Sequence, residues 1–348
     1  MPREICVPNP ILVEVTRGGR VESIHRGALA IADAKGEMHA TLGDIDAAIY
    51  PRSSLKPIQA LALIETGAAD ALGLGGEEIA LACASHSGEL MHTTRVAAWL
   101  ARIGCGEADL ACGPHPPRYE PVWEAMVREK RTPTRLHNNC SGKHTGFLTV
   151  ARHLGIRTAG YEHVDHPVQK QVAAALKDLA GLRGELPYGV DGCAAPNFAV
   201  PLGALARAMA KLADPAGLAP VRTGAARRIV AAMIAHPELV SGTGRACAAL
   251  MRAGEGRVAA KTGAEGVFVA MLPQAGLGIA LKIDDGATRA AEAAIAELLL
   301  KLGVIAGKGE AAGLARAPIF NTRGTIVGER RPAAALAQLE LPSASAGA

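Results

Sequence analysis

Residues 50–57 of the 348-residue chain read Tyr-Pro-Arg-Ser-Ser-Leu-Lys-Pro and contain the spacing Ser-x-x-Lys. A serine hydroxyl is a poor nucleophile until a base takes its proton, and a lysine three residues later can reach it. That lysine must be neutral to act, so burial or a nearby cation has to lower its pKa from about 10.4. The stretch therefore predicts Ser53 as a nucleophile and Lys56 as its base.

Pro57 restricts where the following helix can begin. Proline lacks a backbone N–H and is tolerated only in the first turn, where these groups are unpaired in any case. We therefore expect the helix to begin no earlier than Ser54 as its N-cap, with Ser53 exposed at a strand-to-helix corner. The alternative is that both serines merely cap this helix, because Ser-x-x-Lys alone is a weak motif.

Two further stretches follow in the order found in penicillin-recognising enzymes. Residues 83–89 read Cys-Ala-Ser-His-Ser-Gly-Glu, which could present hydroxyls to a cleft or simply cap another helix. Residues 261–266 read Lys-Thr-Gly-Ala-Glu-Gly. In penicillin-recognising enzymes, a Lys-Thr-Gly strand supplies positive charge and polarises a serine. The three stretches in this order predict a Ser/Lys hydrolase.

Strand patterns lie near both ends of the chain, and helix patterns fill its middle. We expect strands at 11–15, 27–32 and 38–42, and a hairpin of 267–272 with 277–283. Helices are expected at 57–67, 77–84, 91–103, 119–130, 144–154, 167–180, 201–213, 223–235 and 287–302. This order predicts an antiparallel sheet completed by both chain ends, with a mostly helical region inserted.

Two cysteines lie in polar, glycine-containing loops. Residues 138–144 read Asn-Asn-Cys-Ser-Gly-Lys-His, and residues 190–196 read Val-Asp-Gly-Cys-Ala-Ala-Pro. A tetrahedral zinc site has four ligands, so Cys140 and Cys193 would need two more. The chain has no Cys-x-x-Cys that could supply them. Lys143 or His144 could supply one ligand and water the other, although lysine must first lose its proton. The alternative is a pair of ordinary buried thiols.

The composition excludes several classes of protein. Hydrophobic residues make up 49% and charged residues 20%, which excludes a disordered or fibrous chain. Aromatic residues make up 3%, and the net charge of +4 is spread without basic clusters, which argues against a nucleic-acid partner. No apolar run approaches the length of a membrane span, and residues 1–10 do not resemble a signal peptide. Without an export signal, an odd number of cysteines indicates reduced thiols or metal ligands and a cytoplasmic protein. The cysteines are Cys6, Cys83, Cys105, Cys112, Cys140, Cys193 and Cys247.

Together, these motifs resemble the Rhizobium etli-type L-asparaginases (asparaginase II). The resemblance rests on residues 50–59, 84–89, 138–144, 191–197 and 261–266, and it runs from about residue 10 to residue 330. It implies an α/β (α+β) fold like that of serine β-lactamases and glutaminases, assembled as a homodimer. We expect a discontinuous α/β domain at 1–70 and 236–335, a helical region with the zinc site at 71–235, and a flexible tail at 336–348.

The resemblance also implies the site residues, all of which are present with matching types: Ser53 with Lys56, Ser85 with Lys261, and a zinc site of Cys140, Lys143 and Cys193 with water. One departure from true β-lactamases is that Ser-His-Ser replaces Ser-Asp-Asn, which puts β-lactam turnover in doubt. The expected reaction is the hydrolysis of L-asparagine to L-aspartate and ammonia. Zinc would orient the substrate without activating the nucleophile.

Substrate recognition is expected from two charged residues of the motifs. Arg52 suits the α-carboxylate, although a structural ion pair is the alternative, and Asp191 suits the α-ammonium. The competing functions are a glutaminase or β-lactam-type amide hydrolase on the same scaffold, or a non-catalytic zinc- and amino-acid-binding protein.

Overall fold

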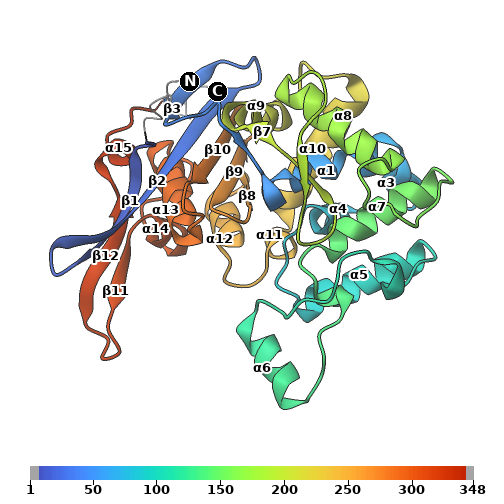
Figure 1. Ribbon diagram of the computed structural model, residues 1–348, viewed down its shortest axis with the longest axis horizontal. Coiled ribbons are helices and arrows are strands. Elements are labelled where there is room, and N and C mark those ends of the chain that lie inside the picture. Colours follow the sequence, from blue (N-terminus) through green and yellow to red (C-terminus); the bar gives the residue numbers. More distant parts are fainter. Residues whose placement is uncertain (1–7, 342–348) are drawn as a thin grey trace, which may run out of the picture.

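The computed structural model describes residues 8–341. An antiparallel sheet, formed by strands from both ends of the chain, lies beside a mainly helical region (Figure 1). The strand order is β11-β12-β1-β2-β10-β9-β8, with β3 paired to β2 off this path. The eight strands are β1 (Ile11–Arg17), β2 (Arg20–Asp33), β3 (Met38–Leu42), β8 (Ala259–Thr262), β9 (Val267–Leu272), β10 (Leu277–Ile283), β11 (Ala317–Phe320) and β12 (Ile326–Pro332). The predicted mixed fold class is confirmed, because the N-terminal strands β1 and β2 lie between the C-terminal strands β12 and β10 in one antiparallel sheet that is accompanied by many helices.

Helices cover both faces of this sheet. Every residue of β9 and nearly every residue of β10 is buried, as expected for strands that are packed on two sides. The helices α9 (Leu202–Ala213) and α13 (Thr288–Lys301) both contact these two strands. Gly278 of β10 permits the close approach of α9, because a Cβ there would lie 2.1 Å from the backbone nitrogen of Ala210.

The inserted region is mainly helical, and its centre is α7 (Ser141–His153), which is buried from Ser141 to Ala151. A Cβ on Gly142 would lie 2.4 Å from the carbonyl oxygen of Leu81, so this glycine lets α7 approach α4 closely. The helices of the region are α1 (Lys56–Gln59), α2 (Leu61–Glu65), α3 (Ala68–Ala71), α4 (Gly76–Ala82), α5 (Leu90–Arg102), α6 (Glu120–Arg128), α7, α8 (Pro167–Ala180), α9 and α10 (Pro220–Ala235). None of the helices in the described part of the chain combines the length and apolar character needed to cross a bilayer.

Four further helices follow this region, and two small sheets are formed by strands within it and just before it. The helices are α11 (Pro237–Val240), α12 (Ala246–Ala253), α14 (Glu310–Ala315) and α15 (Ala334–Ala337). Two small sheets pair β4 (Ala48–Ile49) with β7 (Val200–Pro201), and β5 (Tyr188–Val190) with β6 (Pro196–Phe198). These pairings hold the residues before Ser53 next to the loop that contains Asp191 and Cys193.

Two expectations about local structure are wrong. Ser54 is not an N-cap, because a 3-10 turn, η1 (Arg52–Leu55), has already begun, and the Ser54 hydroxyl donates to the carbonyl of Pro51 at 2.8 Å. The N-cap of α1 is Leu55, without a side-chain cap. The expected single helix over 57–67 is divided between α1 and α2. The hairpin of β11 and β12 was not expected.

The division of the chain into a discontinuous α/β domain (1–70 and 236–335) and a helical region (71–235) remains a prediction. The helix α15 extends two residues into the predicted tail, and Leu336 is fully buried. Residues 342–348 of that tail, like Cys6, lie outside the described residues. The six cysteines between residues 8 and 341 are free thiols.

Gly263 follows β8 where this strand approaches the turn η1, and it provides a test of this packing. A Cβ at this position would lie 2.5 Å from the carbonyl oxygen of Pro51. We expect Gly263→Ala to lower the free energy of unfolding by about 1–3 kcal/mol, because the backbone has to move apart. Denaturant unfolding measures this change. Gly217→Ala is the control, since a Cβ at that position would have nothing within 4 Å; equal stability of both variants would contradict the packing.

Candidate active site

The hydroxyl of Ser85 lies between the amines of two buried lysines. Lys56 Nζ is 3.0 Å from Ser85 Oγ, and Lys261 Nζ is 2.8 Å from the same oxygen. Lys56 opens α1, Ser85 follows the end of α4, and Lys261 lies on β8 at the edge of the sheet. The fold therefore brings the Ser-x-x-Lys, Ser-His-Ser and Lys-Thr-Gly motifs to one point.

Backbone carbonyls accept further hydrogen bonds from both lysines. Lys56 Nζ donates to the carbonyl of Ala84 and, at 3.4 Å, to that of Asn139. Lys261 Nζ donates to the carbonyl of Thr262 at 2.9 Å. These acceptors stabilise amines that are almost without solvent contact.

Burial favours the neutral form of both amines. It lowers the pKa of Lys56, and it lowers the pKa of Lys261 to about 7, with a further contribution from the charge of Lys56. The single hydroxyl hydrogen of Ser85 can be donated to only one amine, which must then be neutral. The lowered pKa of Lys261 makes its neutral, accepting form accessible near neutral pH.

Ser53 lies in the turn η1, three residues before Lys56, and is half-buried. Among the described residues, no hydrogen bond joins the Ser53 hydroxyl to Lys56, whose donors go to Ser85 and two carbonyls. The structure thus brings together Lys56, Ser85 and Lys261, and leaves the predicted pairing of Ser53 with Lys56 as a prediction. Catalytic hydrogen bonds often form only when the substrate is bound.

The backbone is strained at three places in the motifs. Arg52, Ala194 and Glu265 have φ angles of 55°, 74° and 59°, which residues with a Cβ seldom adopt. Such residues concentrate at functional sites, where the surrounding structure holds them. Two of the three interact, because Glu265 Oε1 lies 3.9 Å from Arg52 Nη1.

The two residues expected to recognise the substrate form an ion pair. Arg52 Nη2 and Nε lie 2.8 and 3.2 Å from Asp191 Oδ1. Burial opposes ionisation of Asp191, but the hydrogen bond from Arg52 and the charge of Lys143 outweigh it and lower its pKa. This contact is the structural ion pair that was the alternative for Arg52, and the binding of a substrate by Arg52 and Asp191 stays a prediction.

The predicted zinc ligands form a buried cluster of two thiols and an amine. Lys143 Nζ lies 3.0 Å from Cys193 Sγ, and the thiol of Cys140 donates to Asn139 Oδ1 at 2.9 Å. The neighbouring Cys140 and Lys143 lower the pKa of Cys193 to about 4, and the same cluster raises the pKa of Lys143. A thiolate and a second thiol are the ligands that zinc prefers, whereas Lys143 would have to release its proton to an ion that replaces it beside Cys193.

His144, the alternative ligand to Lys143 in the sequence, contacts Tyr161. Its Nδ1 lies 2.7 Å from the hydroxyl of Tyr161, which accepts a hydrogen bond from the N–H of Ala111. Burial lowers the pKa of His144 to about 3, so the ring is neutral. Lys143, rather than His144, lies beside Cys193.

Sequence reasoning did not assign roles to three other residues of the motifs. Asn139 connects the two clusters, since its carbonyl accepts from Lys56 and its side chain from Cys140. The side-chain oxygen of Asn197 accepts the N–H of Arg52 at 3.1 Å. Glu89 accepts from the N–H and the hydroxyl of Thr243. Their place inside the motif stretches was the one signal that could have drawn attention to them.

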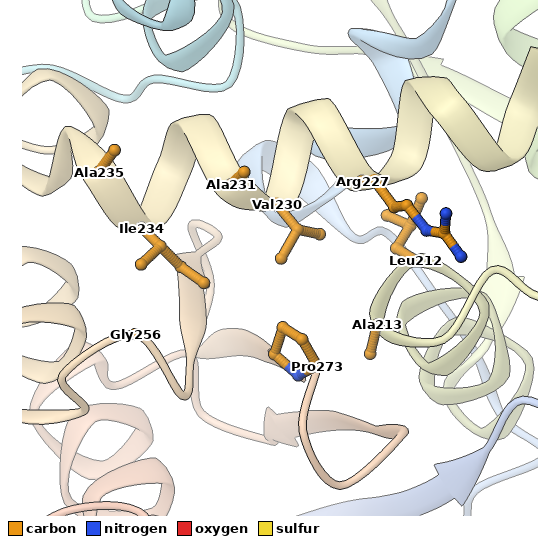
Figure 2. Close-up of a pocket in the computed structure, with 9 residues that line it drawn as sticks. All are labelled: Leu212, Ala213, Arg227, Val230, Ala231, Ile234, Ala235, Gly256 and Pro273. Atoms are coloured by element: carbon orange, nitrogen blue, oxygen red, sulfur yellow. The ribbon is translucent and has the colours of Figure 1, made fainter.

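A pocket of about 360 Å³ lies elsewhere, between α10, the end of α9 and the turn after β9 (Figure 2). Apart from Arg227, the described residues that line it are uncharged. No predicted site residue lines this pocket, and it contains no nucleophile or base. It is therefore not the candidate active site.

Comparison with solved structures yields distant similarities. Mglu in its native form in the presence of 4.3 M NaCl is 19% identical, with 82% of this chain and 63% of that chain covered and a TM-score of 0.46. Mglu in its L-glutamate binding form is 18% identical, with 82% and 62% covered and a TM-score of 0.44. A β-lactamase from Mycobacterium bovis is 16% identical, with 76% and 89% covered and a TM-score of 0.40. The chain thus spans less than two thirds of Mglu.

No curated protein sequence matches the chain. A family model does match, over residues 13–332, and this range includes all the motifs that meet around Ser85 and Cys193. The chain belongs to the L-asparaginase II family.

Proposed function

We propose that this protein hydrolyses the side-chain amide of L-asparagine and releases L-aspartate and ammonia. Membership of the family supports an amidohydrolase. The observation that carries the mechanism is the buried contact of Ser85 with both Lys56 and Lys261. Lys56 directly follows the turn η1, which contains Ser53.

In the proposed reaction, Ser53 Oγ attacks the amide carbon and its proton passes to Lys56. Ser85 relays a proton toward the leaving nitrogen, the C–N bond breaks, and ammonia departs. Water then cleaves the β-aspartyl ester, which restores the Ser53 hydroxyl. The pair of Arg52 and Asp191 would hold the α-carboxylate and the α-ammonium of the substrate.

Cys140, Lys143 and Cys193 would hold the zinc ion. The ion would add a positive charge next to the loop of Asp191 and so help to orient the polar groups of the substrate. The contact of Asn139 with both Cys140 and Lys56 connects this cluster to the catalytic lysine. The homodimer and the cytoplasmic location stay predictions.

Replacing each serine separately tests the nucleophile. We expect Ser53→Ala to lower kcat by about 10⁴-fold or more, because no other group would form the ester. Ser85→Ala should lower kcat by about 10²–10⁴-fold, since the proton relay is lost. Ammonia release from L-asparagine measures both.

Ser54→Ala is the matched control, since the Ser54 hydroxyl donates to the carbonyl of Pro51. Ammonia release that survives Ser53→Ala but not Ser85→Ala would move the nucleophile to Ser85. If the wild type acts on glutamine or a chromogenic β-lactam instead, the substrate is wrong. A thermal shift with asparagine but no turnover would favour a binding protein.

The pKa of Lys261, about 7, predicts how the rate depends on pH. Above this pH Lys261 is neutral, so Lys56 can take up the proton of Ser53. Below this pH the positive charge of Lys261 opposes that proton uptake, because both amines contact the same Ser85 oxygen. We expect kcat/KM to fall about tenfold per pH unit below pH 7. Lys261→Arg, which stays charged, should have a low kcat/KM that does not rise between about pH 6 and pH 8. A wild-type profile that is flat between about pH 6 and pH 8 would contradict the assignment.

Metal analysis tests the zinc site without relying on activity. We expect about one zinc per chain in the wild type and loss of the metal in Cys193→Ser and Cys140→Ser. Cys112→Ser is the matched control, because Cys112 is also fully buried but is not a proposed ligand. Chelation should lower Tm by about 5 °C or more and raise KM with kcat retained. Complete loss of kcat on chelation would show that the ion does more than orient the substrate.

A further inference from the structure

The residue before Ser53 has an unfavourable backbone conformation. Arg52 has a φ of 55°, and its Cβ makes this left-handed conformation costly. Arg52 also carries the guanidinium that contacts Asp191. The same torsion angle therefore affects the position of Ser53 and the direction of the Arg52 side chain.

One buried side chain from a distant part of the chain contacts this backbone. Asn197, 6% exposed, accepts the N–H of Arg52 on its Oδ1 at 3.1 Å. Asn197 lies in β6, where it pairs with Gly189 of β5. The acceptor is thus attached to a small sheet rather than to a mobile loop.

Other contacts around the turn do not fix this N–H. The N–H and hydroxyl of Ser54 both donate to the carbonyl of Pro51, at 3.2 and 2.8 Å. Gly263 packs close to the same carbonyl. They hold the turn after Arg52, whereas the N–H of Arg52 itself depends on Asn197.

We propose that Asn197 is a positioning residue that holds Arg52 in its left-handed conformation and thereby places Ser53 and the Arg52 guanidinium. This inference rests on the proposed function only for its effect on turnover. A backbone N–H can only donate, so the oxygen of the Asn197 amide must face Arg52. Asn197→Asp keeps that acceptor at the same position, and Asn197→Ala removes it.

A stability cycle tests the backbone role without any substrate. Arg52→Ala and Arg52→Gly both remove the guanidinium, but only glycine adopts a positive φ without strain. We expect Asn197→Ala to lower the denaturant midpoint clearly in the Arg52→Ala background and much less in the Arg52→Gly background. Equal losses in the two backgrounds would overturn the proposal, since Asn197 would then be an ordinary buried polar group.

Turnover provides the second measurement. We expect Asn197→Ala to lower kcat of the folded enzyme by about 10- to 100-fold, because the nucleophile is misplaced. Asn197→Asp should restore kcat to within about tenfold of the wild type, with the effect of its extra charge appearing in KM. An Asn197→Asp variant as slow as Asn197→Ala would overturn the proposal. If the wild type releases no ammonia, the proposed function fails, and the stability cycle alone decides the role of Asn197.

Discussion

The rest of the site depends on one hydroxyl that is shared by two buried amines. Two ammonium groups beside one oxygen in the protein interior would repel each other and lack hydration. The structure accommodates them in two ways: three backbone carbonyls accept their hydrogens, and burial makes the neutral form of Lys261 accessible near pH 7. Ser85 can then accept a proton from one side and donate one to the other.

The architecture positions these groups on elements that are themselves fixed by packing. Lys261 lies on an edge strand of the sheet, Ser85 follows a helix packed against the buried α7, and Lys56 follows the turn η1. Glycines permit the close approaches at both contacts, Gly263 next to Pro51 and Gly142 next to Leu81. A displacement of either element would separate the lysines from their shared oxygen.

Three buried lysines illustrate how surroundings decide the chemistry of one residue type. The pKa values of Lys56 and Lys261 are lowered because burial dominates, whereas that of Lys143 is raised because the thiolate of Cys193 is 3.0 Å away. The first two can therefore act as proton carriers, and the third is a cation in the metal-free protein. Environments that separate the pKa values of like groups are typical of catalytic sites.

The sequence by itself determined the fold class, the order of the motifs and the close spacing of Ser53 and Lys56, because these follow from local periodicity and short separations. It did not determine where the helix after Ser53 begins: Ser54 was expected as the N-cap, but it lies inside the turn η1. The family resemblance implied the pairing of Ser85 with Lys261, and the structure shows this contact across 176 positions. Only the tertiary structure showed that Lys56 contacts the same hydroxyl and that Asn197 accepts the N–H of Arg52 across 145 positions. Contacts at such separations, and a left-handed φ on an arginine, leave no periodic signal, because they arise only when separate elements pack together.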